Sequence, residues 1–231
     1  MKKKIIKFAI IIILILILIL MAFACSYYFK NRNENIYYNS SILESYILDV
    51  EAQNSIKIAG VTYSEQDMRL REYFYGEKDD TTRREVIDTI IFSTEARRRK
   101  LKVETEIQEE IKKRINNYKF SDEFLDTINY DEEELKEKMI ETCLDIEFEL
   151  NLKIHIQREI LQNNITIEND ILKSKVQAFF DKYNFIKKET PNSTYTEEEI
   201  NNIYSQYTNE VEELTNEYLN SIRNNIKVEN L

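Results

Sequence analysis

The chain opens with an uninterrupted apolar segment behind a short basic one. Residues 1–7 contain four lysines and no acidic residue, and residues 8–25 are apolar throughout. A run of this length can cross the hydrocarbon core of a membrane as a helix. The basic residues before it place the N-terminus on the cytoplasmic side, and Tyr27, Tyr28 and Phe29 suit a membrane–water interface. The pattern therefore predicts a retained signal-anchor, a transmembrane helix, within residues 1–29.

Two other fates of this segment compete with a retained anchor. Ala22 and Ala24 fit a small-x-small site for signal peptidase, and Cys25 after Ala24 resembles a lipoprotein attachment site. Cys25 is therefore a candidate for lipidation. In all three cases the residues from Lys30 onward reach the outer face of the membrane. We expect a single-pass protein of the cell membrane whose domain is extracytoplasmic.

Beyond the anchor, apolar residues recur mainly at helical spacing. A juxtamembrane segment over residues 30–55 contains a first helix, which begins with a capping-box pattern at Ser41 and Glu44. Similar polar pairs mark further helix starts at Ser64, Thr82, Asp131 and Thr196. The apolar stripes predict helices over about 107–117, 131–161, 171–183 and 197–223.

Two short segments alternate between apolar and polar residues, as strands do. Residues 56–58 precede a turn at Ala59 and Gly60, and residues 226–228 follow the last helix. We expect these two segments to pair. Two glycines and one proline in 231 residues leave too few turn formers for a sandwich or a barrel. The predicted fold class is all-α, an elongated multi-helix domain over residues 56–231 with a minimal two-stranded pairing.

Three stretches between residues 56 and 161 stand in a characteristic order. They are a strand, glycine turn and capped helix at 56–68, a hydrophobic helix with a basic exit at 86–103, and a capped entry to a long helix at 130–135. Together they resemble the N-terminal chaperone domain of the SurA/PrsA/PpiD group of extracytoplasmic folding factors. The last helix and residues 226–228 resemble the C-terminal piece that packs back onto that domain. The chain departs from the family at Lys100, where glycine is usual, and at Glu104, where Ser or Thr is frequent.

The resemblance implies a chaperone that binds unfolded or newly exported polypeptides. The parvulin-type prolyl isomerase of this family would need a further domain with glycines and histidines between the two long helices. Residues 161–196 contain neither residue type. We therefore expect polypeptide binding without catalysis. The alternative is a non-catalytic scaffold or assembly subunit for one dedicated secretion or envelope partner.

The candidate polypeptide contacts are large side chains gathered in one short predicted helix: Met68, Tyr73, Phe74 and Tyr75. Simple core packing is the alternative interpretation of these four residues. No catalytic residue, cofactor or metal site is predicted, because the single histidine, His155, has no nearby histidine or cysteine to share a metal. Cys143 lies in an apolar stripe and is interpreted as a core residue.

The net charge of −10 includes the four N-terminal lysines, so the chain after residue 7 carries 28 basic and 42 acidic residues, a net charge of −14. Such a surface repels nucleic acid, which is excluded as a partner. The one basic cluster is Arg97–Lys100. We interpret it as the solvated last turn of a helix, where cations complement the helix dipole, rather than as a phosphate site.

Overall fold

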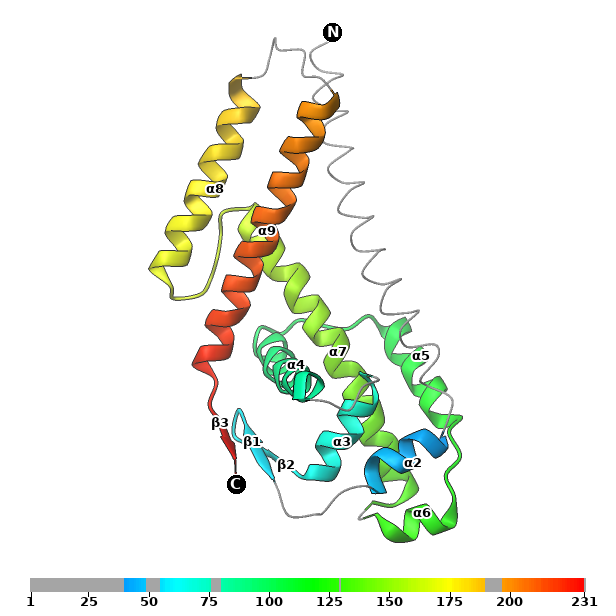
Figure 1. The fold of residues 1–231 in the computed structure, drawn as a ribbon. Coiled ribbons are helices and arrows are strands. Elements are labelled where there is room, and N and C mark those ends of the chain that lie inside the picture. Colours follow the sequence, from blue (N-terminus) through cyan, green and yellow to red (C-terminus); the bar gives the residue numbers. More distant parts are fainter. Residues whose placement is uncertain (1–39, 49–54, 76–79, 129, 190–196, 231) are drawn as a thin grey trace.

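The computed structural model describes residues 40–48, 55–75, 80–128, 130–189 and 197–230 of the chain (Figure 1). In chain order, its elements are α2 (Ser40–Leu48), β1 (Ile56–Ile58), β2 (Val61–Tyr63), α3 (Glu65–Tyr73), α4 (Asp80–Arg98), α5 (Thr105–Asn116), α6 (Asp122–Thr127), α7 (Glu132–Leu161), α8 (Asp170–Glu189), α9 (Glu197–Asn225) and β3 (Val228–Asn230). Helices dominate, as the apolar spacing predicts.

The longest helix, α7, begins and ends where the sequence predicts. The Asp131 side chain accepts a hydrogen bond from the backbone N–H of Glu134 at 2.8 Å and so caps the first turn. At the other end Asn163 has a left-handed backbone with φ 51°, and the N–H of Asn164 reaches back to the carbonyl of Glu159 at 2.9 Å. This closure satisfies carbonyl groups that the helix leaves without partners.

The helices α3 and α4 start by different signals. Ser64 and Asp67 form the predicted capping box of α3. The predicted start of α4 at Thr82 is wrong by two residues, because the helix begins at Asp80 and Thr82 is buried inside it.

At the end of α4, Lys100 adopts φ 59°. This left-handed conformation is the one for which glycine is best suited, so Lys100 holds a strained backbone position.

The small sheet has three strands, so the predicted two-stranded pairing is incomplete. The order is β2-β1-β3 and both pairs are antiparallel. The pairing of residues 56–58 with the C-terminal segment is confirmed, but Ile58 faces Val228, so the strand lies two residues later than predicted. The missed strand, β2, returns from the turn at Gly60 and places Val61 beside Ile58.

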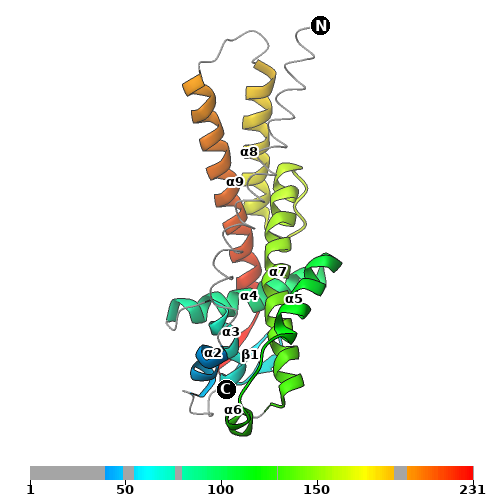
Figure 2. The ribbon, with the colours of Figure 1, turned by 90° about the vertical axis from the view of Figure 1, so that its right-hand side faces the viewer.

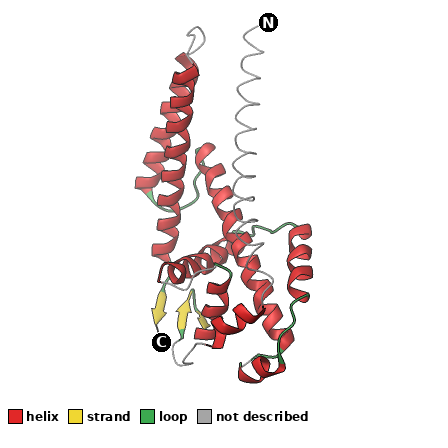
Figure 3. Cartoon of the chain, turned by 45° about the vertical axis from the view of Figure 1, so that its right-hand side comes forward, coloured by secondary structure: helices red, strands yellow, loops and turns green. Residues whose placement is uncertain are grey.

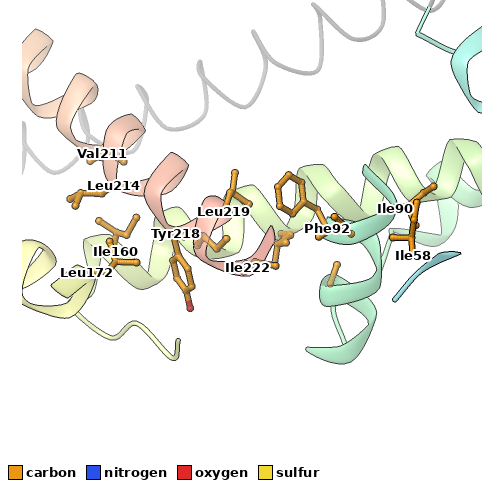
Figure 4. Packing of buried hydrophobic residues seen from close by; sticks show 14 of the residues in the cluster. Ile58, Ile90, Phe92, Ile160, Leu172, Val211, Leu214, Tyr218, Leu219 and Ile222 are labelled. Carbon is orange, nitrogen blue, oxygen red and sulfur yellow. The ribbon is translucent and has the colours of Figure 1, made fainter. Parts of the chain in front are cut away.

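Two apolar clusters form the core, and α7 takes part in both. The lower cluster joins α2, α3, α5, α6 and the first half of α7, with Leu135 and Met139 fully buried. The upper cluster joins β1, α4, α8, α9 and the second half of α7, with Ile156 and Ile160 fully buried. Figure 4 shows Ile160 and Leu172 beside the apolar stripe of α9 in the upper cluster.

The helices α8 and α9 form an antiparallel pair that extends past the C-terminal end of α7 (Figures 1 and 2). We call this pair the arm, and α2–α7 with the sheet the body. The cartoon in Figure 3 shows the sheet at the end of the arm that meets the body. The molecule is therefore elongated, as the length of the helices predicts.

The membrane prediction falls on residues without a structural description. Within the described ranges, no helix is both long enough and apolar enough to span a bilayer. The predicted anchor over residues 1–29, the candidate lipidation site Cys25 and the predicted cap at Thr196 all lie outside the described residues. These three remain predictions from the sequence.

Candidate polypeptide-binding site on the α8–α9 arm

The four predicted polypeptide contacts lie in and after α3, at the junction of the two apolar clusters. Met68, Tyr73 and Phe74 are at most 2 % exposed, and the rings of Tyr73 and Phe74 meet edge to face at 5.2 Å. Tyr75 is partly exposed, and its hydroxyl is hydrogen-bonded to the hydroxyl of Thr89. Their positions match the core-packing interpretation. An exposed surface for a polypeptide has to be sought elsewhere on the molecule.

The arm is held together by an apolar seam that becomes aromatic away from the body. Near the body, Leu172 and Val176 of α8 are buried within the upper cluster together with α9. Farther out the rings of Phe179, Tyr183 and Tyr207 contact one another, with centroid distances of 4.8, 5.4 and 4.7 Å. Contacts between tilted and edge-on rings stabilise the pair of helices beyond the effect of burial alone.

The burial of the α9 stripe changes where α7 ends. Tyr218, Leu219 and Ile222 are buried, since α4 and α7 both pack against this half of α9. Toward the outer end, Ile203 and Tyr204 are only partly buried. Two helices alone leave apolar surface open, because a helix stripe needs a further layer to cover it. The outer half of the arm lacks a third helix among the described residues.

Five side chains of the arm, which together we call the open aromatic face, are left incompletely buried. All are large, apolar or aromatic, and partly exposed: Phe180, Tyr183, Ile203, Tyr204 and Tyr207. Sequence reasoning identified the stripe of α9 but not its exposure. The available signal was length, because the stripe of α9 extends far beyond what one neighbouring helix covers.

Ion pairs on the surface of the arm fix how its two helices align. Lys175 of α8 contacts Glu217 of α9 at 2.6 and 2.8 Å, and Lys182 pairs with Glu210. Exposed pairs of this kind contribute little stability each, about 0.2–1 kcal/mol. The Lys182 ammonium also lies 5.1 Å from the centroid of the Tyr183 ring. A tyrosine of the open aromatic face is thus already in contact with a cation.

A buried polar cluster, which we call the joint, fixes the arm to the body. The Tyr218 hydroxyl donates to Glu159 of α7 at 2.8 Å and accepts from Arg99, which follows α4, and from the backbone N–H of Ile167, both at 3.1 Å. The Thr166 hydroxyl also lies 3.2 Å from the Tyr218 oxygen, so four groups surround this one hydroxyl. Figure 4 shows the hydroxyl directed away from the apolar side chains. Burial raises the pKa of Tyr218, so the hydroxyl keeps its proton.

The joint corrects the interpretation of the basic cluster Arg97–Lys100 as a solvated last turn. Arg98 and Lys100 are exposed, but the Arg99 side chain is only 10 % exposed and also contacts Glu95 and Glu159. Burial alone would lower the pKa of Arg99, but its hydrogen bonds with Glu95 and Tyr218 outweigh that effect and the pKa is raised. A basic residue at a helix end can therefore be a buried contact between helices.

A second polar layer lies between α3, α4 and α7, among apolar neighbours. The Asp145 carboxylate accepts from Arg71 and from Arg97, each at 2.5 Å, and its side chain is only 3 % exposed. Beside it, the Thr89 hydroxyl donates to Glu149 at 2.5 Å. Buried charges are tolerated only when they are paired in this way. The layer sets the alignment of α4 on α7.

The two other residues discussed from the sequence, Cys143 and His155, both lie on α7. Cys143 lies in the lower apolar cluster, as its interpretation as a core residue predicts. His155 is on α7 with Nε2 3.6 Å from Glu159. Over the described ranges, no three His, Cys, Asp or Glu side chains are grouped so that they could hold a metal ion.

Comparisons of the chain with known protein families, with curated proteins and with solved structures found no match in any of the three.

Proposed function

We propose that this chain is a membrane-anchored, extracytoplasmic protein of chaperone type that binds unfolded or newly exported polypeptides without catalysis. The open aromatic face of the arm is the binding surface in this proposal. The anchor is the apolar segment over residues 8–25, and the remainder of the chain acts on the outer face of the membrane. The resemblance to the SurA/PrsA/PpiD group gives the proposal its functional class.

The observation that carries the proposal is the partial exposure of Phe180, Ile203 and Tyr204 on the outer half of the arm. Aromatic and aliphatic side chains that stay partly exposed on a surface are candidates for protein interaction. Tyrosine and phenylalanine offer large contact areas at a small entropic cost, which suits the recognition of varied sequences.

The pairing of β1 with β3 gives further support. Ile58 lies opposite Val228, so the C-terminal strand packs back onto the segment that begins the domain. The resemblance implies such a closure. It keeps the end of α9 in the body while the other end of the helix projects, so that the arm has one fixed end.

The proposal is tested by the suppression of aggregation. The full chain in nanodiscs is added to a chemically denatured, exported polypeptide during refolding, and light scattering is followed at increasing molar ratios. We expect dose-dependent suppression. The double variant Phe180→Ser/Tyr204→Ser should require several-fold more protein for the same effect, because it removes two side chains of the open aromatic face.

The matched control removes two exposed apolar side chains outside this face, Leu48 (51 % exposed) and Ile171 (73 % exposed). The variant Leu48→Ser/Ile171→Ser should suppress aggregation as the unmodified chain does. Empty nanodiscs and an unrelated acidic helical protein complete the comparison. If the unmodified chain fails to suppress aggregation at several-fold excess and instead captures one stoichiometric partner from cells, the dedicated scaffold is the better description.

A further inference from the structure

The strand β3 forms one outer edge of the sheet. It pairs with β1, and none of the described elements is drawn beyond it in Figures 1 and 3. The Lys227 carbonyl accepts a hydrogen bond from the Ala59 N–H at 3.3 Å, on the side of β1. Backbone groups alternate in direction along an antiparallel strand, so the N–H and C=O of Val228, the next residue, point away from β1. An edge with outward N–H and C=O groups can accept a further strand.

An apolar row crosses the sheet and ends at this edge. Val61, Ile58 and Val228 lie opposite one another on the three strands, and so their side chains are on the same face. Ile58, in the middle of the row, is fully buried, whereas Val228 is 40 % exposed. A strand added along β3 would cover Val228 and continue the row.

The charged residues on either side of Val228 fit a second copy of the same strand. Lys227 and Glu229 share the face opposite Val228, and their side chains pair within the chain at 2.5 Å. If two β3 strands pair antiparallel with Val228 facing Val228, each Lys227 faces Glu229 of the other copy. Opposite charges at facing positions stabilise a strand pair, and like charges destabilise it. The strand is therefore complementary to itself, as an interface with two-fold symmetry requires.

We propose that two copies of this chain pair through the outer edges of their β3 strands, antiparallel and with Val228 on the two-fold axis. The two three-stranded sheets then become one continuous sheet. The outward N–H and C=O groups of each Val228 bond to those of the other copy. This inference concerns a different surface from the polypeptide-binding arm and goes beyond the proposed function.

The pairing depends on how densely the chains are placed. A strand pair of this length buries much less than the roughly 1,200–2,000 Å² of a stable protein interface. Dilute chains in solution should therefore stay monomeric. Chains held in one membrane by the proposed anchor meet at a higher effective concentration, which favours the pair.

Crosslinking between copies tests the pairing. The full chain with Cys25→Ser is reconstituted into liposomes at increasing protein-to-lipid ratios and treated with a short bis-maleimide; the remaining native cysteine, Cys143, is buried. Val228→Cys places two thiols at the axis, where facing Cα atoms are about 5.5 Å apart. It should give several-fold more crosslinked dimer than the control Val61→Cys, at the other edge of the sheet, where the valine is 54 % exposed.

Exchange of charges tests the register. In the Val228→Cys chain, Lys227→Glu places like charges opposite one another across the axis, and so does Glu229→Lys. A Lys57→Gln background keeps the second of these variants from facing a lysine of its own sheet. Each variant alone should give several-fold less crosslinked dimer.

A mixture of the two charge variants, carrying tags of different length, should recover the crosslinking as a mixed dimer. Each facing pair in the mixed dimer joins a lysine to a glutamate. The Lys227–Glu229 pair within the chain is broken in both variants. Recovery can therefore come only from contacts between copies.

Three results would overturn the proposal. Equal crosslinking from Val228→Cys and Val61→Cys would mean that random encounters in the membrane account for both. A mixture that recovers nothing would contradict the antiparallel register. If no dimer forms at any ratio but an added denatured polypeptide protects the thiol introduced by Val228→Cys, the edge accepts an extended chain of another protein instead. Polypeptide binding by the arm is measured separately, through aggregation, and stands or falls independently.

Discussion

The Tyr218 hydroxyl on α9 donates a hydrogen bond to the Glu159 carboxylate on α7 at 2.8 Å. The same oxygen accepts hydrogen bonds from Arg99, directly after α4, and from the backbone of the loop before α8. Helices from the body and the arm thus meet at one buried atom. Because this buried hydroxyl joins groups from the body and the arm, it helps to fix the direction in which the arm leaves the body.

The variant Tyr218→Phe keeps the ring and removes only the oxygen of the joint. The carboxylate, the guanidinium and the backbone N–H then lose a partner in a buried site, which should lower the free energy of unfolding by about 1–3 kcal/mol. Chemical denaturation of the full chain in detergent measures the loss. Tyr204→Phe, on a partly exposed ring, should change the free energy by less than about 0.5 kcal/mol. Equal effects of the two variants would contradict the role of the joint.

Asp145 neutralises two arginines at the polar layer between α4 and α7. The variant Asp145→Ala leaves the buried Arg71, whose side chain is 7 % exposed, without this carboxylate and also removes a partner of Arg97, whose side chain is 39 % exposed. The expected loss is about 3–5 kcal/mol, the usual cost of breaking a buried ion pair. Asp126→Ala, on the exposed surface of α6, serves as the control and should stay within about 0.5 kcal/mol. If Asp145→Ala lowered the free energy of unfolding as little as Asp126→Ala does, the polar layer around Asp145 would be accessible to water.

Lys100 is a position where the chain can be made more stable. Its φ of 59° costs energy for any residue with a side chain, and glycine adopts it freely. Lys100→Gly should raise the free energy of unfolding by roughly 0.5–1 kcal/mol. Lys112→Gly, inside α5 before its last turn, should instead lower the free energy of unfolding by about 1 kcal/mol. A loss at both positions would be evidence against the left-handed end of α4.

Stability should respond in opposite directions to two carboxyl replacements. Burial raises the pKa of Glu147, and Glu110 of α5 raises it further. The folded state therefore disfavours the ionised form, so Glu147→Gln should increase stability at pH 7. The gain should vanish as pH falls below the ordinary pKa of glutamate, where both side chains are neutral.

Asp67 provides the opposite case. Burial alone would raise its pKa, but hydrogen bonds from Lys138 and Ser64 outweigh that effect and the pKa is lowered. Asp67→Asn should therefore reduce stability at pH 7, with the difference lost as pH falls through the lowered pKa. Denaturation curves measured from roughly pH 3 to pH 7 compare the stability of both variants with that of the unmodified chain. The same sign for both would contradict the pKa directions.

Local signals in the sequence were sufficient for most helices. The capping groups of Ser64 and Asp131 are short-range contacts, and the apolar stripe of α7 continues without a break, so its bounds follow directly. Val61, Thr62 and Tyr63 alternate as a strand does, but β2 was missed because these three residues were assigned to the connection between the turn at Gly60 and the helix start at Ser64. The helix α6 is a single turn and a half capped by Ser121, too short for a recognisable stripe.

The predicted polypeptide contacts in and after α3 are buried by packing between helices, and the spacing of apolar residues along the sequence does not reveal that packing. Tyr73 and Phe74 form a conspicuous cluster of large residues, but α3 lies at the junction of both apolar clusters, which encloses them. Tyr204 belongs to an ordinary apolar stripe. It is exposed because α7 does not extend along the outer half of the arm, a relationship between helices far apart in sequence.

The most direct test of the account is photo-crosslinking from the open aromatic face. The full chain in nanodiscs carries benzoylphenylalanine in place of Tyr204 or, as the control, in place of Leu48 of the body. It is irradiated with a chemically denatured exported polypeptide, and the products are mapped by mass spectrometry. We predict crosslinks to the polypeptide from position 204 and few from position 48. Equal yields from the two positions, or yields at 48 that exceed those at 204, would contradict polypeptide binding by the arm.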